Sequence, residues 1–393
     1  MAQPARPSPA QDPNFRALPP LAPLLKWAGG KERELRTILP MVPPFARYYE
    51  PFAGGGAVFF ALRPANAYLN DRSPELIALY RAVAAGEPVF FAALDTLLRD
   101  WKRLTALAED GLAPLSAAYA VSIAEPDSGG ELRAAVARFI AEHAATLAAL
   151  CAGPLPNSDQ LADHVRAQIE RNLLSKTRRM RAIGQRKGAL PSTDVTANLE
   201  AALKSAYYMH VRHLLNSAAL LAVPAGVAAA LFYFVRENAY ASMFRYNRRG
   251  ALNVPYGGIS YNRKGLARKV AHLRSLEVRD LLGSATLTSL DFAEFLRAHP
   301  PAPEDFLFLD PPYDSEFSTY ARHEFGPADH ERLAAYLLRE CPARFLLVIK
   351  DTPLIRRLYG NAGLRISMAG KRYLVSFQDR NNREAEHLFI RNY

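Results

Sequence analysis

Cysteine is scarce in this sequence, because its 393 residues include only two, Cys151 and Cys341. Two thiols exclude a disulfide framework and a metal site built on several cysteines, so an intracellular, reducing compartment is the simplest setting. The first twenty residues also lack the apolar core of a secretory signal peptide. Because residues 1–20 are rich in proline, we expect them to form a disordered tail.

Acidic residues are too few to balance the basic ones. The chain has 49 Lys and Arg residues against 38 Asp and Glu residues, which gives a formal net charge of +11 at pH 7. Such a charge favours an anionic partner, either nucleic acid or an anionic membrane surface. With 50% hydrophobic and 22% charged residues, the composition is that of a soluble globular protein with one large or two modest domains.

One long run without charge is present, residues 214–235, and it raises the question of a transmembrane helix. Asn216, Pro224, Gly226 and several alanines make the run weakly hydrophobic, and it stands alone. We therefore expect a buried helix that is broken near Pro224, and no membrane insertion.

Short apolar runs alternate with helical patterns in two parts of the chain, residues 23–80 and the part from residue 285 onward. This rhythm of strand and helix predicts an α/β fold with a mainly parallel sheet. The predicted strands are residues 46–52, 67–71, 285–290, 305–310, 344–350, 372–377 and 386–393. The last two lie near each other and suit a hairpin at the end of the sheet.

The region between these two parts is alanine-rich and largely helical in pattern. The simplest organisation is one α/β domain, residues 21–81 and 271–393, interrupted by a mostly helical insertion, residues 82–270. The end of the insertion, residues 240–269, mixes glycine and asparagine with tyrosine and arginine, which is typical of a loop region with a basic, aromatic surface.

A glycine-rich turn follows the first predicted strand, in the sequence YYEPFAGGGAVFF. Gly54 and Gly56 allow a ligand to approach the backbone between this strand and the next helix. The following strand ends at Asn70 and Asp71, and Asp71 lies 21 residues after Glu50. A nucleoside-binding sheet places the acceptor for a ribose hydroxyl at that distance, so the two features together predict a nucleoside site.

A complete phosphate-binding loop is missing. The segment WAGGKER, residues 27–33, lacks the first glycine of that pattern and has Glu32 in place of the Ser or Thr that holds Mg²⁺. A nucleoside with a carboxylate instead of phosphates, as in S-adenosylmethionine, would need one cation such as Lys31 and an aromatic ring such as Trp27. The alternative is a solvated surface lysine and a core tryptophan.

The segment LDPPYD, residues 309–314, follows a short apolar run. Pro311 and Pro312 have no backbone donor, so the chain must leave the sheet there. The turn carries two acceptors, the Asp310 carboxylate and the Pro311 carbonyl, and the ring of Tyr313. Acceptors that bind the hydrogens of an adenine amine as its nitrogen pyramidalises would favour its methylation, while the ring stacks on the base. Chance is the alternative in a chain with 29 prolines.

Five motifs, LLKWAGGK, YEPFAGGGAVFF, FRYNRRGALNVPYG, DFLFLDPPY and AEHLFIRNY, occur together in this order. Their order resembles that of the Dam-type (class alpha) DNA adenine N6 methyltransferases, over residues 23–80 and 231–393. The resemblance implies a Rossmann-like methyltransferase sheet of seven strands, S-adenosylmethionine as methyl donor and no metal. It also implies double-stranded DNA as substrate, with the target adenine flipped out of the duplex.

The resemblance assigns roles to individual residues. The expected cofactor contacts are Trp27, Lys31, Gly54, Gly56, Asp71, Asp291 and Asp310. The expected catalytic residues are Asp310, Pro311, Pro312 and Tyr313. The expected DNA contacts are Lys26 and, within the expected target-recognition region of residues 82–270, Tyr240, Arg245, Asn247, Arg248, Arg249 and Tyr256.

Some questions stay open at this point. Residues 240–244 read YASMF where many relatives read FNGLY, so the recognition sequence GATC does not transfer. Residues 171–187 carry seven basic residues, which extend the phosphate footprint or form an exposed helix face or a disordered loop. A silent DNA-binding protein and a methyltransferase for RNA or cytosine N4 are the rival functions. The family further suggests a cytoplasmic bacterial or phage-encoded protein, with a cognate restriction endonuclease as a candidate partner.

Overall fold

A computed structural model describes residues 19–27, 29–124, 129–150, 152–156, 158–243, 245–247, 249–263, 265–313, 325–372 and 384–393. Nearly all of the expected N-terminal tail, residues 1–18, lies outside these described residues. The chain divides into two compact units. The sheet unit consists of Met1–Ala85, Met243–Gly250 and His272–Tyr393, and the helical unit of Gly86–Ser242 and Ala251–Ala271.

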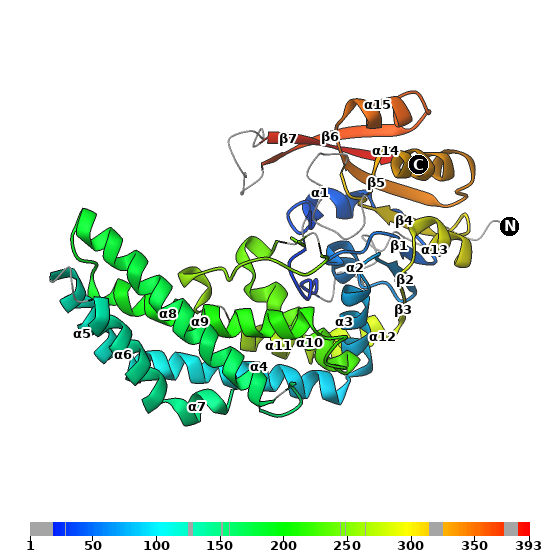
Figure 1. The fold of residues 1–393 in the computed structure, drawn as a ribbon. Helices are drawn as coiled ribbons and strands as arrows, with labels where there is room; N and C mark the ends of the chain where they lie inside the picture. Colours follow the sequence, from blue (N-terminus) through cyan, green and yellow to red (C-terminus); the bar gives the residue numbers. More distant parts are fainter. Residues whose placement is uncertain are drawn as a thin grey trace. The chain divides into compact units, whose positions relative to one another are not determined.

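The sheet unit is built on a seven-stranded sheet with the strand order β3-β2-β1-β4-β5-β7-β6 (Figure 1). The strands are β1 (Tyr48–Glu50), β2 (Ala67–Asn70), β3 (Ala285–Thr288), β4 (Phe306–Leu309), β5 (Arg344–Lys350), β6 (Arg365–Arg372) and β7 (Glu384–Arg391). The first five strands pair in parallel, and β7 is antiparallel to both β5 and β6.

This sheet confirms the predicted α/β fold, and β6 and β7 pair antiparallel at its end, where a hairpin was expected. Strand β6, Arg365–Arg372, shares only Arg372 with the segment 372–377 that the sequence indicated as a strand. Residues 373–377 of that segment lie outside the described residues.

Neighbouring residues of β1 point to opposite faces of the sheet, as strand geometry requires. On one face, Tyr49 packs in a buried cluster that includes Phe295 and Leu333 from two helices. On the other face, the Tyr48 ring stacks on Phe59 with a centroid distance of 6.5 Å. Both faces of the sheet are covered, which explains why the strand FLFL of β4 is apolar and buried throughout.

The helices of the sheet unit surround these strands. They are α1 (Leu35–Ile38), α2 (Ala57–Leu62), α3 (Pro74–Ala85), α12 (Leu276–Gly283), α13 (Phe292–Ala298), α14 (Pro327–Arg339) and α15 (Pro353–Tyr359), with the 3-10 helix η1 (Leu39–Met41). The chain runs from β1 outward to β2 and β3, and then returns to β4 on the other side of β1. The strand order therefore reverses between β1 and β4, and open α/β sheets bind ligands at the carboxyl ends of such strands.

Although residues Met243–Gly250 belong to the sheet unit, the helical unit covers most of residues 82–270, the range given to the insertion by the sequence. Its helices are α4 (Pro88–Gly111), α5 (Ala113–Ala124), α6 (Gly129–Glu142), α7 (Ala144–Ala148), α8 (Asp159–Lys187), α9 (Ser192–Asn216) and α10 (Ala225–Asn238), with the 3-10 helices η2 (Tyr240–Ser242) and η3 (Ile259–Tyr261). Helix α11 (Leu266–Leu273) begins in this unit and ends in the sheet unit. Trp101 of α4 packs edge to face against Phe234 of α10, with ring centroids 5.3 Å apart.

The uncharged run at residues 214–235 is broken where the sequence predicts. Helix α9 ends at Asn216, and α10 begins after Pro224. Helix α10 is buried almost throughout, whereas Leu220 in the break is 88% exposed. No single helix in the described ranges is long and apolar enough to cross a membrane; α3 and α4 meet that criterion together by length and composition, but they are bent by 104°.

Candidate active site

Three carboxylates lie at the edge of the sheet where the parallel strands end. Glu50 is the last residue of β1, Asp71 follows β2, and Asp310 follows β4. Strand β1 pairs with both β2 and β4, so the three acids come together at the reversal of strand order. Among the described residues, no group of three His, Cys, Asp or Glu side chains is placed to hold a metal ion.

Glu50 belongs to this site although no role was predicted for it from the sequence. Its side chain is 2% exposed and accepts a hydrogen bond of 2.9 Å from the Tyr48 hydroxyl. Burial raises the pKa of Glu50 well above its usual value, and the charges of Asp310 and Asp71 raise it further. The signal in the sequence was an acid that closes a buried strand directly before a glycine-rich turn.

The Asp71 carboxylate is fixed by backbone amides. One oxygen accepts from the Gly54 N–H at 2.8 Å, and the other accepts from the Ser73 N–H at 2.8 Å. Burial raises the pKa of Asp71 to about 6. A carboxylate has about four acceptor positions, so two stay available for the hydroxyl groups of a ligand.

The glycine-rich turn forms a cradle beside Asp71. Gly54 and Gly56 both adopt the left-handed conformation, with φ of +49° and +65°. A Cβ atom on Gly54 would lie 2.7 Å from Cδ1 of Trp27, so the indole ring covers this glycine directly. The Tyr80 hydroxyl donates to the Gly54 carbonyl at 2.7 Å and holds the turn from the other side. An aromatic wall, a bare backbone turn and a carboxylate together fit a nucleoside cofactor.

Lys31 connects the N-terminal segment to the turn after β4. Its side chain is 2% exposed, which excludes a solvated surface lysine. The ammonium group donates to Oδ2 of Asp310 at 2.5 Å, to the Tyr313 hydroxyl at 2.9 Å and to the Gly29 carbonyl at 2.9 Å. Lys31, which the sequence predicts as the cation for a cofactor carboxylate, is therefore paired with Asp310, the predicted catalytic acid.

The turn DPPY leaves the sheet directly after β4. Pro311 is buried, Pro312 is exposed, and Tyr313 is half-buried. The Tyr313 ring meets the ring of His387 at a steep angle of 66°, with centroids 5.3 Å apart. His387 of β7 is 1% exposed, and its Nδ1 lies 3.8 Å from a carboxylate oxygen of Glu34.

His387 and Glu34 are neighbours of the site that were not predicted from the sequence. His387 is part of the motif AEHLFIRNY, but alternation along a terminal strand does not show that its ring faces Tyr313. No sequence pattern indicates that the segment of Glu34 lies next to the last strand.

Asp291 lies at the rim of the same edge. It caps α13 by accepting from the Ala293 N–H at 3.0 Å, and it forms an ion pair of 2.6 Å with Arg332. The preceding residue, Leu290, is hydrogen-bonded through both backbone groups to the side chain of Asn70 at the end of β2. The cap of α13 and the ion pair with Arg332 thus give Asp291 a local structural role.

The predicted DNA contacts are distributed over both units. Lys26, Arg245, Asn247 and Arg249 are exposed residues of the sheet unit, and Tyr240 in the helical unit is 45% exposed. Arg248 lies outside the described residues.

Tyr256 has a different setting from the other predicted contacts. It is only 7% exposed, donates to Oδ1 of Asn262 at 3.0 Å and packs 5.8 Å from the Trp101 ring. It is a core residue of the helical unit, and its burial does not favour the predicted DNA contact.

The basic stretch at residues 171–187 is helical, since it forms the C-terminal half of α8. The structure thus excludes a disordered loop for this stretch. An exposed helix face and a DNA-binding surface remain as alternatives.

Comparison with known proteins identifies the family. The sequence model described as D12 class N6 adenine-specific DNA methyltransferase matches residues 27–109 and 184–371, which is more than half of the chain. The matched ranges include β1, β2, β3, β4, β5 and the DPPY turn. They leave out α5, α6, α7 and most of α8.

Curated relatives agree with this match. The type II methyltransferase M.CviBI of Paramecium bursaria Chlorella virus NC1A is 24% identical over 380 residues, which cover 95% of this chain and 100% of the relative. The DNA N-6-adenine-methyltransferase of Escherichia phage P1 is 23% identical over 361 residues, which cover 90% of this chain and 33% of the relative. The retron Ec67 DNA adenine methylase of Escherichia coli is 30% identical over 138 residues, 34% of this chain and 45% of the relative.

The seven-stranded sheet and the extent of the match lead to the same identification. Enzymes of this kind act on DNA and take their methyl group from S-adenosylmethionine. The chain belongs to the D12 class of N6 adenine-specific DNA methyltransferases.

Proposed function

We propose that this enzyme methylates N6 of an adenine that is flipped out of duplex DNA at a specific site, with the DPPY turn as its catalytic element. The observation that carries the proposal is the contact of the Lys31 ammonium with both Asp310 and Tyr313. This contact lies at the carboxyl ends of β1 and β4, beside the cradle of Gly54 and Asp71.

The cradle suits S-adenosylmethionine, which supplies an electrophilic methyl group on a sulfonium when bound. Asp71 keeps acceptor positions for the ribose hydroxyls, and the Trp27 ring with Gly54 and Gly56 shapes the wall beside it. Lys31 is the buried cation proposed for the methionine carboxylate, which would replace one of the three acceptors that the ammonium group now binds. Asp291 is proposed at the rim, toward the adenine of the cofactor.

The catalytic turn binds the target base. The Asp310 carboxylate and the Pro311 carbonyl accept the hydrogens of the N6 amine as this nitrogen becomes pyramidal and attacks. These hydrogen bonds strengthen in the transition state, which lowers the barrier. Pro311 and Pro312 fix the turn in advance, and the Tyr313 ring stacks on the base. In a direct transfer the N6 lone pair would form the new nitrogen–carbon bond while the carbon–sulfur bond of the methyl donor breaks, and one N6 proton would then pass to the Asp310 carboxylate or to solvent. This chemistry needs no metal.

Base flipping costs a few kcal/mol of unstacking and unpairing, which contacts to the DNA must offset. Stacking on Tyr313 offsets part of this cost, and Tyr240 is exposed enough to fill the space that the base leaves. Lys26, Arg245, Asn247, Arg248 and Arg249 are proposed to contact the duplex. Arginine and asparagine either read base edges or bind phosphates, and mutagenesis separates these roles.

The biological setting is proposed from the relatives. The viral relative is named a type II methyltransferase, which suggests a restriction-modification system and a cognate restriction endonuclease as partner. We place the enzyme with the DNA, in the cytoplasm of a bacterial cell or of a cell infected by a phage.

Replacement of Asp310 tests the catalytic assignment. Asp310→Ala is expected to lower single-turnover methyl transfer by at least about 10²- to 10³-fold, because one charged transition-state acceptor is removed. The matched control is Asp280→Ala, which removes an exposed carboxylate from α12. Equal rates for the two variants, with melting temperatures close to wild type, would remove Asp310 from the mechanism.

A further inference from the structure

Helix α8 has a basic C-terminal half that lies mostly outside the family match, which resumes at residue 184. Residues 171–187 contain no acid, and the three acids of α8, Asp159, Asp163 and Glu170, all precede them. The seven basic residues are Arg171, Lys176, Arg178, Arg179, Arg181, Arg186 and Lys187. The adenine methyltransferase match therefore leaves most of this charge without an explanation.

The charge is concentrated on the solvent side of the helix. Leu173, Thr177, Met180 and Gly184 are buried and recur every three or four residues, so they form the packed face. Arg171, Arg178, Arg179 and Arg186 are all exposed. At 3.6 residues per turn, these four arginines fall on one side of the helix, opposite the packed face.

The dipole of α8 does not compensate most of the positive charge of residues 171–187. The helix dipole favours basic residues in the last turn only, which accounts for Arg186 and Lys187. Lys176 and Arg179 are three residues apart, and such like-charged pairs destabilise a helix. The pKa of Lys176 is lowered by burial and by the charge of Arg179.

Neighbouring acids do not balance the charge either. The exposed arginines Arg171, Arg178, Arg179 and Arg186 form no ion pair with a carboxylate in the described part of the chain. Exposed positive charges that no described carboxylate pairs with are complementary to an anionic partner.

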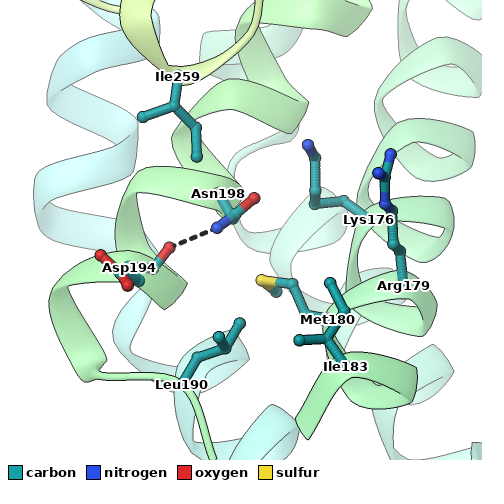
Figure 2. A pocket seen from close by; sticks show the side chains of 8 residues that line it. All are labelled: Lys176, Arg179, Met180, Ile183, Leu190, Asp194, Asn198 and Ile259. Atoms are coloured by element: carbon teal, nitrogen blue, oxygen red, sulfur yellow. Dashed lines mark hydrogen bonds between the residues drawn. The ribbon is translucent and has the colours of Figure 1, made fainter. Parts of the chain in front are cut away.

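A cavity of about 340 Å³ opens beside this face, between α8, α9 and η3. Figure 2 shows Lys176 and Arg179 with their charged ends extending in the same direction from α8, and Asn198 and Ile259 on the facing side. The Asn198 side chain is held by a hydrogen bond of 2.8 Å to the Asp194 carbonyl. The cavity thus combines two cations, one acid, Asp194, and an anchored amide with an apolar base that includes Met180 and Ile183, so basic residues outnumber acidic ones in its lining.

The rim of this cavity is connected to a segment with a proposed DNA contact. Ile259 belongs to η3, and Tyr261 of the same 3-10 helix accepts a hydrogen bond of 3.1 Å from the Ala241 N–H. Ala241 follows Tyr240, which is proposed to contact the duplex. Within the helical unit, the rim of this cavity is therefore linked through η3 to the segment that carries Tyr240.

We propose that the basic face of α8 binds the phosphodiester backbone of duplex DNA outside the recognition site. Arg178, Arg179 and Arg186 each contact a phosphate, because the planar guanidinium matches phosphate oxygens in a bidentate geometry. The cavity between Lys176, Arg179 and Asn198 takes a further phosphate and its sugar. Such contacts position the protein on DNA and do not read sequence. The proposal rests on the proposed function only in that DNA is the anion.

Salt dependence of binding tests this surface. Two triple variants remove the same charge. One carries Arg178→Gln, Arg179→Gln and Arg186→Gln on the basic face of α8, and the other carries Arg133→Gln and Arg138→Gln on α6 with Arg166→Gln in the N-terminal half of α8, outside that face. All six arginines are exposed. Fluorescence anisotropy of two labelled duplexes of unrelated sequence, titrated at several NaCl concentrations, gives log Kobs against log salt.

The α8 variant is expected to have a shallower slope, by about 0.9 for each phosphate that the protein no longer neutralises. The decrease in affinity is expected to be equal on both duplexes, and the control variant is expected to keep the wild-type slope. The melting temperature of the α8 variant should match or exceed that of the wild type, because like-charge repulsion is removed. Equal slopes for both variants, or a decrease confined to one sequence, would overturn the proposal. Methyl transfer by the wild-type enzyme, measured in parallel, tests the proposed function independently.

Discussion

The ammonium nitrogen of Lys31 lies 2.5 Å from a carboxylate oxygen of Asp310, although 279 residues separate them in the chain. The same nitrogen donates to the Tyr313 hydroxyl at 2.9 Å. One buried side chain therefore connects the segment before β1, which carries Trp27, to the proposed base-binding turn after β4. Cofactor binding and base positioning are expected to depend on this residue together.

Lys31→Met is expected to weaken cofactor binding and to lower the turnover number at saturating cofactor, because the variant lacks both the cation and the anchor of the turn. Breaking a buried ion pair by removing one partner costs about 3–5 kcal/mol, so a decrease in melting temperature is also expected. Calorimetric titration and steady-state kinetics measure the two effects. A change in cofactor affinity alone would contradict the proposed link to the catalytic turn.

Cofactor binding is expected to weaken as the pH falls through about 6, the value to which burial raises the pKa of Asp71. A proton on Asp71 removes one acceptor position and the negative charge that strengthens its hydrogen bonds from the ribose hydroxyls. Calorimetric titration with S-adenosylhomocysteine between pH 5 and 8 measures the dependence. In Asp71→Asn the step is expected to disappear, and its persistence would assign the titration to another group.

The raised pKa of Asp71 has the opposite effect on the stability of the ligand-free protein, which increases as the pH falls. The pKa of Asp71 is raised from 3.8 to about 6, so between these values the folded state binds the proton more tightly than the unfolded state. Asp71 therefore contributes stability as the pH falls through 6 and opposes folding above it. Urea unfolding of the wild type and Asp71→Asn across this range should show a difference that shrinks toward acid pH.

Gly54→Ala is expected to abolish cofactor binding at concentrations that saturate the wild type. Its Cβ would lie 2.7 Å from Cδ1 of Trp27, so the indole ring must move, and the φ of +49° is strained for alanine. The matched control is Gly363→Ala, where φ is +68° and a Cβ meets no atom within 4 Å. Both variants should lose about 1 kcal/mol of stability from backbone strain, and only Gly54→Ala should lose the cofactor. Normal cofactor binding by Gly54→Ala would contradict the proposal that the glycine-rich turn forms part of the cofactor site.

His387→Ala is expected to lower the turnover number several-fold, with little change in cofactor affinity. His387 supports the Tyr313 ring at a centroid distance of 5.3 Å, and an aromatic pair of this geometry contributes about 0.5–1.5 kcal/mol. His387→Phe keeps a ring in this position and should retain most of the activity. Equal decreases in the two variants would assign the effect to the pair of His387 with Glu34 rather than to the ring contact.

The edge of the sheet was predictable because polar residues directly follow apolar strands. Glu50, Asp71 and Asp310 each end such a run, and parallel strands bring their carboxyl ends to one edge. The rigid turn at Pro311 and Pro312 was visible for the same reason, since two prolines must leave the sheet.

The contacts between distant segments were not predictable. No local pattern indicates that Lys31 meets Asp310, or that His387 on β7 faces Tyr313, because the packing of the whole sheet decides both contacts. Tyr256 shows that composition alone does not distinguish an exposed tyrosine from a buried one. A tyrosine in a basic loop suggests a DNA contact, but the helical unit buries this ring against Trp101.

The central claim is that the chain methylates N6 of adenine in duplex DNA. The most direct measurement is incubation of the purified enzyme with methyl-labelled S-adenosylmethionine and duplex DNA from a host without adenine methylation, followed by nucleoside mass spectrometry. We predict labelled N6-methyladenine with wild-type enzyme and almost none with Asp310→Ala. Label found only in N4-methylcytosine, or no label in DNA with the active cofactor, would contradict the claim.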